Sequence, residues 1–121
     1  MISLERVIEI FIAEGFDIFI FNSNDGSEQL VYLPESMNYQ GLLMTISFDN
    51  YQNGKCVFPK FKVASKNYRP QMSYDYGEVV DLKIISETDL QQKVHNLMQD
   101  AIMTNKQIIQ AKRTNKIKKD F

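Results

Sequence analysis

The first apolar residues of the chain recur with the period of an α-helix. The residues that share this face are Leu4, Val7, Ile8, Phe11 and Ile12. Ser3 stands where an N-cap residue would accept a hydrogen bond from the first turn. Gly15 stands where a left-handed cap would end the helix, so that Phe16 folds back onto its last turn. We therefore predict a helix over residues 3–14.

The middle of the chain has the composition and alternation of β-strands. In residues 42–48 one face is apolar and the other carries Thr45 and Ser47, which is the two-residue period of a strand. The predicted strands cover residues 16–21, 29–33, 42–48, 56–63 and 78–85. Asn24-Asp25-Gly26 and Asn53-Gly54 are turn sequences. Pro59 lacks a backbone N–H, so the fourth strand lies at a sheet edge or is bulged there.

A long helix is predicted at the end of the chain. The apolar stripe consists of Leu90, Val94, Leu97, Met98, Ala101, Ile102, Ile108 and Ile109. Two capping pairs compete for its start, Thr88 with Gln91 and Ser86 with Asp89. No glycine or proline interrupts the chain from Thr88 onward. We expect this helix to run from residue 89 to about residue 115.

These elements predict a two-layer α+β fold. Its order is an N-terminal helix, a five-stranded, mainly antiparallel meander sheet and a long C-terminal helix, because short connections favour antiparallel neighbours. A length of 121 residues, with 44% hydrophobic and 24% charged residues, suits one globular domain. In this domain residues 1–105 form the α+β body and residues 106–121 a basic helical extension.

The two faces of the predicted sheet are both partly apolar. One face carries Phe19, Phe21, Leu33, Leu43 and Phe58, and the assumed core face carries Ile18, Ile20, Met44, Ile46, Phe61 and Val63. Either the two helices cover different faces, or one face keeps an apolar patch. Coverage is the commoner arrangement.

The last helix is longer than the body that carries it. About 27 residues span roughly 40 Å, whereas a domain of this size is about 35 Å across. Ile108 and Ile109 lie near the expected overhang, and Ile117 lies beyond it. A partner could bury these isoleucines. The alternative is that the helix frays after about Lys106 and ends in a solvated tail.

Residues 65–77 predict a long connection with the composition of an interface. Thirteen residues is long for a loop inside a compact domain. Tyrosine, arginine and methionine are enriched where proteins bind each other. The residues of these types here are Tyr68, Arg69, Met72, Tyr74 and Tyr76. The alternative is that the tyrosines pack over the open end of the sheet.

The charge of the chain is divided unevenly. Residues 106–121 hold six basic residues and one acidic residue, a net charge of +5, whereas residues 1–105 hold eight basic and fourteen acidic residues, a net charge of −6. The basic end could neutralise phosphates of a nucleic acid without reading its sequence. It could equally face an acidic protein surface, or serve the helix dipole alone.

No catalytic, metal-binding or cofactor-binding pattern emerges. His95 is the only histidine and Cys56 the only cysteine, so a metal site would need carboxylates for its remaining ligands. His95 has Gln91 and Gln99 as same-face neighbours, and neither would activate it. The five glycines stand singly at expected caps and turns, not in a phosphate-binding loop. We expect no enzyme activity and no cofactor.

The sequence favours a non-catalytic protein-interaction or assembly subunit in a hetero- or homo-oligomer. The alternative is a nucleic-acid-binding accessory protein that uses the basic end. Neither a small-molecule substrate nor a membrane partner is indicated. The predicted partner-binding residues are Tyr68, Arg69, Met72, Tyr74, Tyr76, Ile108, Ile109, Lys112, Arg113, Lys116 and Ile117.

Two further features bear on the setting in which the protein works. A lone cysteine and short, charge-interrupted apolar runs predict a cytoplasmic location, or a virion or complex assembled there. Abundant Ile, Asn, Lys, Phe and Tyr indicate an AT-rich genome. A small phage- or mobile-element-encoded protein fits both features, either a virion component or a host-factor inhibitor.

Overall fold

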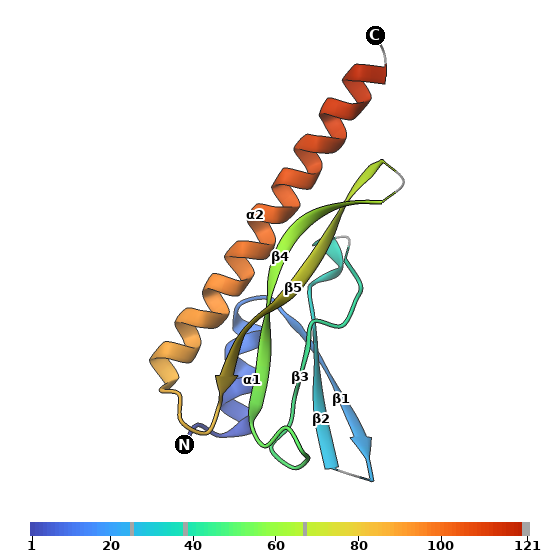
Figure 1. The fold of residues 1–121 in the computed structure, drawn as a ribbon. Helices are drawn as coiled ribbons and strands as arrows, with labels where there is room; N and C mark the ends of the chain where they lie inside the picture. Colours follow the sequence, from blue (N-terminus) through green and yellow to red (C-terminus); the bar gives the residue numbers. More distant parts are fainter. Residues whose placement is uncertain (25, 38, 67, 120–121) are drawn as a thin grey trace.

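The computed structural model describes residues 1–24, 26–37, 39–66 and 68–119, and within 115–119 it describes the backbone. The described residues form two α-helices and two antiparallel sheets (Figure 1), so the predicted α+β class is confirmed. The elements in chain order are α1 (Leu4–Ala13), β1 (Asp17–Ser23), β2 (Gly26–Tyr32), the short 3-10 helix η1 (Glu35–Met37), β3 (Met44–Ile46), β4 (Lys55–Lys66), β5 (Arg69–Asp81) and α2 (Glu87–Lys119).

The first helix forms and ends as its sequence predicts. The Ser3 hydroxyl accepts a hydrogen bond from the Arg6 N–H at 3.1 Å. At the other end Gly15 takes a φ of +100°. The Gly15 N–H then donates to the Ile12 carbonyl and the Phe16 N–H to the Phe11 carbonyl, a Schellman cap. Phe16 packs its ring edge-on against Phe11, with 5.6 Å between ring centroids.

The predicted single five-stranded sheet is wrong, because the strands divide into two sheets. Sheet A has the order β1-β2-β3, and sheet B is a ribbon of β4 and β5 alone. The turn through Asn53 and Gly54, both at positive φ, redirects the chain after β3. β4, which is twelve residues long, then pairs with β5 and does not join sheet A.

The predicted loop over residues 65–77 is also wrong, since β5 occupies most of it. Lys66 pairs with Arg69, so two residues join β4 to β5. The predicted strand over residues 78–85 ends early at Asp81. There the Asp81 carboxylate accepts a hydrogen bond from the Lys83 N–H at 3.0 Å and turns the chain.

The irregularity expected at Pro59 is confirmed. The register shifts between the pairs Val57–Val79 and Pro59–Tyr76, which leaves an extra residue on β5. Gly77 lies within this bulge, where a Cβ atom would come within 2.7 Å of the Phe58 carbonyl oxygen. Close approach of the two backbones therefore requires glycine at this position.

The last helix begins at the second of the two predicted caps. The Ser86 hydroxyl accepts a hydrogen bond from the Asp89 N–H at 3.1 Å. From Glu87 the helix continues for 33 residues, about 50 Å. Its buried side chains are Leu90, Val94, Leu97, Met98, Ala101, Thr104 and Ile108.

This stripe lies along the β4–β5 ribbon (Figure 1). The Asp100 carboxylate accepts a hydrogen bond from the Phe61 N–H of β4 at 3.0 Å. On β5, Glu78 pairs with Lys93 at 2.7 Å. Because the ribbon is longer than predicted, it supports the helix as far as Ile108, which is 5% exposed. Beyond the ribbon tip α2 runs on alone (Figure 1).

The first helix completes the core against both sheets. Phe11 is fully buried, and its ring lies 6.0 Å from that of Phe58 on β4. Arg6 pairs with Glu87 at the start of α2. Farther along, the His95 ring nitrogen lies 3.1 Å from the Glu14 carboxylate. The sequence-based neighbours of His95, Gln91 and Gln99, are therefore not its partners.

The second apolar face that the sequence predicts is covered in part. Leu33, Leu43 and Phe58 are buried. Phe19 and Phe21 on β1 remain exposed. Coverage therefore holds for β4, for the residue after β2 and for the segment before β3, and an apolar patch remains on β1.

We predict that Cys56 makes the protein less stable as the pH rises above 9. Burial, with a smaller effect of Asp81, raises the pKa of this thiol from 9.0 to about 12. Between these values the unfolded thiol loses its proton and the folded thiol keeps it, so this group lowers the free energy of unfolding by up to about 1.4 kcal/mol per pH unit. Urea unfolding at pH 8 to 10.5 should show a steeper decline for the natural protein than for Cys56→Ala. Parallel declines would contradict the prediction.

Candidate interaction surface

A groove lies at the end of the molecule where the ribbon tip, α2 and the connection after η1 meet. We call it the distal groove. Its lining residues are Met37, Tyr39, Gln40, Gly41, Pro70, Gln71, Met72, Asn105, Ile108, Ile109 and Lys112. Three segments far apart in the sequence therefore contribute to one surface.

Four of the predicted partner-binding residues line this groove together. Met72 comes from β5, whereas Ile108, Ile109 and Lys112 come from α2. Met72 and Ile108 are buried and form the floor of the groove. Ile109 is 40% exposed, and Lys112 is exposed beside it. The groove thus combines an apolar floor with an accessible isoleucine and a cation at its rim.

The predicted tyrosines do not act as one set. Tyr74 is partly buried against the core, as the packing alternative anticipated. Its hydroxyl donates a hydrogen bond to the Leu42 carbonyl at 2.9 Å, which ties the connection before β3 to the ribbon. Its ring is edge-on to those of Tyr39 and Tyr76, at 6.1 and 6.3 Å. Tyr76 itself is exposed.

Tyr68 lies at the ribbon tip, in the two-residue loop that joins β4 to β5. Its φ is +62°, in the left-handed region that such short hairpin loops require. Its side chain is 98% exposed. Arg69 beside it is also exposed. The tip thus presents an aromatic side chain that nothing in its own fold explains.

Of the three remaining predicted residues on α2, the structure places the side chain of one. Arg113 is exposed on α2 but is not part of the lining. The side chains of Lys116 and Ile117 are outside the described residues. Met37 and Tyr39 were not among the predicted binding residues, and they lie between the predicted strands 29–33 and 42–48. Tyr39 was the one indication in the sequence that this segment contacts the rest of the fold, since an aromatic residue in a polar segment often packs against the core. Burial, and then the neighbouring Tyr74, raises the pKa of Tyr39.

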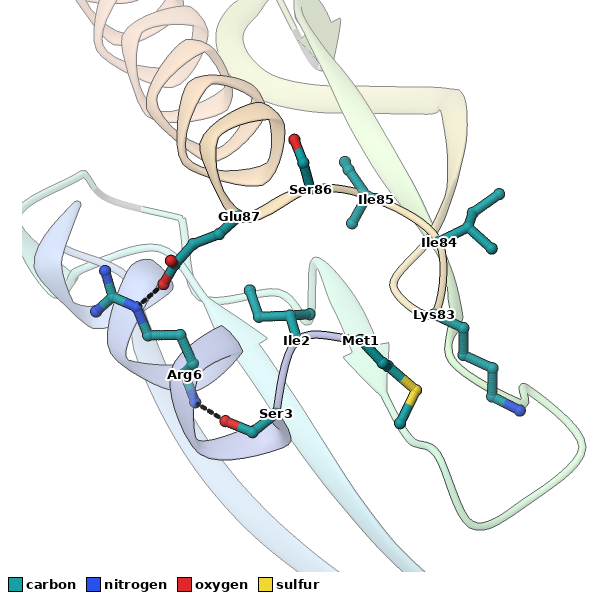
Figure 2. Close-up of a pocket in the computed structure, with 9 residues that line it drawn as sticks. All are labelled: Met1, Ile2, Ser3, Arg6, Lys83, Ile84, Ile85, Ser86 and Glu87. Atoms are coloured by element: carbon teal, nitrogen blue, oxygen red, sulfur yellow. Dashed lines mark hydrogen bonds and ion pairs between the residues drawn. The ribbon is translucent and has the colours of Figure 1, made fainter.

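A second cavity lies beside the first residues of the chain (Figure 2). Its lining includes Ser3, Arg6, Ile84 and Glu87. The Arg6 guanidinium pairs with Glu87 and Glu9, and these carboxylates raise the pKa of Arg6. The one carboxylate in the lining is thus already engaged by a cation, and its role there is to join α1 to α2.

The titratable groups do not gather into a reactive centre in the part of the chain that the structure describes. No group of three histidine, cysteine, aspartate or glutamate side chains could hold a metal ion there. Cys56 is buried with a raised pKa, so its thiol stays protonated at neutral pH. His95 and Glu14 form a pair between the helices, on residues partly open to solvent.

Comparison with family models, with curated proteins and with solved structures finds no match to this chain. Over the described ranges, no helix combines the length and apolar character needed to cross a membrane.

We predict that Tyr74→Phe will destabilise the protein, whereas Tyr76→Phe will not. The first change removes the hydrogen bond to the Leu42 carbonyl, which should cost about 1 kcal/mol. The Tyr76 side chain is exposed, so its hydroxyl group contacts water and its removal should not change the stability. Urea unfolding of both variants measures the difference. Equal effects would show that the Tyr74 hydroxyl does not hold the connection in place.

Proposed function

We propose that the protein is a non-catalytic interaction or assembly subunit that binds a partner protein through the distal groove and the ribbon tip. The observation that carries this proposal is the exposed Tyr68 in a left-handed conformation, beside a groove with Ile109 and Lys112 at its rim. The two-residue loop between β4 and β5 accounts for this backbone conformation, whereas the 98% exposed tyrosine side chain makes no packing contribution to the fold.

The chemistry of this surface suits a protein partner. Tyrosine, methionine and arginine are the residue types that contribute most at protein interfaces. Here Tyr68 and Arg69 lie at the tip and Met72 lies in the groove floor. We expect Tyr68 and Ile109 to insert into the partner and Lys112 to meet an acidic group at the rim. Such a subunit would act in the cytoplasm, or in a virion or complex assembled there.

The nucleic-acid alternative rests on the cations at the end of α2. Lys106, Lys112 and Arg113 are exposed. A truncation after Lys106 would also remove the buried Ile108, so charge substitutions test this alternative more cleanly.

We predict that Tyr68→Gly and Ile109→Ser will each weaken capture of a partner protein from native-host lysate by at least about tenfold. Glycine tolerates positive φ, so Tyr68→Gly should change stability by no more than about 1 kcal/mol. The matched controls are Tyr51→Gly and Ile84→Ser, which alter exposed residues elsewhere. Quantitative mass spectrometry of the captured proteins is the measurement. Equal losses for variants and controls would overturn the proposal.

We predict that the natural protein will not bind DNA or RNA at low salt. Nucleic-acid binding through α2 would instead fall steeply with salt, and it would weaken in the double variant Lys112→Gln, Arg113→Gln. Fluorescence anisotropy with labelled oligonucleotides at two salt concentrations measures this. Salt-sensitive binding lost in the double variant would favour the alternative over the protein-interaction proposal.

A further inference from the structure

The outer edge of β1 is unpaired from Asp17 to Asn22 in the described chain. Sheet A has the order β1-β2-β3, so β1 is an edge strand. Figure 1 shows β1 (blue) at the outside of the molecule, on the far side of β2 from β3. An edge strand exposes a row of backbone N–H and carbonyl groups that can pair with another strand.

Large apolar side chains project from both faces of this strand. Phe19 is 60% exposed, Ile20 is 66% exposed and Phe21 is 52% exposed. Because side chains alternate, the two phenylalanines lie on one face and Ile20 on the other. We call these three residues the β1 edge. No other strand of the described chain has three consecutive exposed large apolar residues.

The devices that usually protect an edge strand are missing from β1. Its register with β2 runs without a bulge from Asp17 paired with Tyr32 to Ser23 paired with Gly26. The strand contains no proline and no lysine, and its one charge is Asp17 at the first position. A regular, apolar edge whose one charge lies at its first position favours pairing with another strand.

We propose that the β1 edge pairs with β1 of a second copy of this chain, antiparallel and about a two-fold axis at Ile20. Ile20 then faces the partner's Ile20, and Phe19 faces the partner's Phe21. The two three-stranded sheets become one continuous six-stranded sheet. Such an interface uses the same surface of both copies and closes after two.

The pattern of side chains around Ile20 favours a second copy as the occupant. The axis at Ile20 gathers four phenylalanines on one face, next to Tyr32, whose ring is already 5.6 Å from that of Phe19. It also sends Asp17 to the two opposite ends of the paired segment, so the carboxylates do not meet. An axis at Phe19 would instead place Asp17 opposite the partner's Phe21.

The pairing should be reversible. An interface of seven residues per strand is small. Interfaces that bury less than about 1,200 Å² are typical of transient contacts. The dimer population should therefore rise with protein concentration. The surface is separate from the distal groove, so the dimer can fail while the proposed partner binding holds.

The test is sedimentation velocity of the full chain over about a hundredfold range of concentration. The expected result is a shift from 14.1 kDa towards twice that mass. Ile20→Lys should weaken the dimer at least about a hundredfold, because two isoleucines lose burial and two like charges face each other. Ile20 is exposed in the single chain, so the urea midpoint should hold. Ile84→Lys, also at an exposed isoleucine, is the matched control.

A mixture of Ile20→Lys and Ile20→Glu variants tests the position of the axis. Opposite charges should restore a mixed dimer, since only pairing at Ile20 places the two substituted positions opposite each other. Four results would overturn the proposal. They are a monomer at all concentrations, a dimer insensitive to Ile20→Lys, open-ended assemblies of rising mass, and no recovery on mixing.

Discussion

A two-stranded ribbon such as β4–β5 is marginally stable in water on its own, because little of its apolar surface is covered. A long helix likewise gains most of its stability by packing an apolar face, not from propensity alone. In this protein each element supplies what the other lacks. The stripe from Leu90 to Ile108 covers the ribbon, and the Asp100 carboxylate satisfies the Phe61 N–H. The rest of the core, including Phe11 of α1, assembles against this pair.

The length of the ribbon decides which surfaces remain for binding. Because β4 and β5 extend to the pair Lys66–Arg69, the buried stripe of α2 continues to Ile108. Ile109 lines the groove instead, and the end of α2 runs on beyond the ribbon tip (Figure 1). The overhang that the sequence predicts therefore begins later than expected, after Ile108, although the helix itself is longer than expected and runs to Lys119. In the proposed function, the exposed tip of the ribbon takes part of the binding role that the sequence analysis assigned to the overhang.

Local features of the fold could be predicted, and long-range pairing could not. Caps at Ser3 and Gly15 and the stripe of α2 depend on neighbours within a few residues. The alternation of Met72, Tyr74 and Tyr76 with polar residues was a strand signal in the predicted loop, but turn-forming neighbours obscured it. Division into two sheets depends on where β4 goes after Gly54, which no local pattern specifies. Four of the eleven residues that line the groove were among the predicted binding residues, namely Met72, Ile108, Ile109 and Lys112.

The β1 edge is exposed because the helices pack elsewhere. The described residues contain two α-helices, and the apolar stripe of α2 packs against the ribbon. Phe19 and Phe21 therefore lack a covering helix. If a second copy supplies that cover, each dimer displays two distal grooves. A partner with repeated sites would then be held at both grooves, and the combined affinity would exceed that of one groove without any new contact, provided both grooves can reach their sites together. Weak self-pairing and a small groove would then suffice for an assembly subunit.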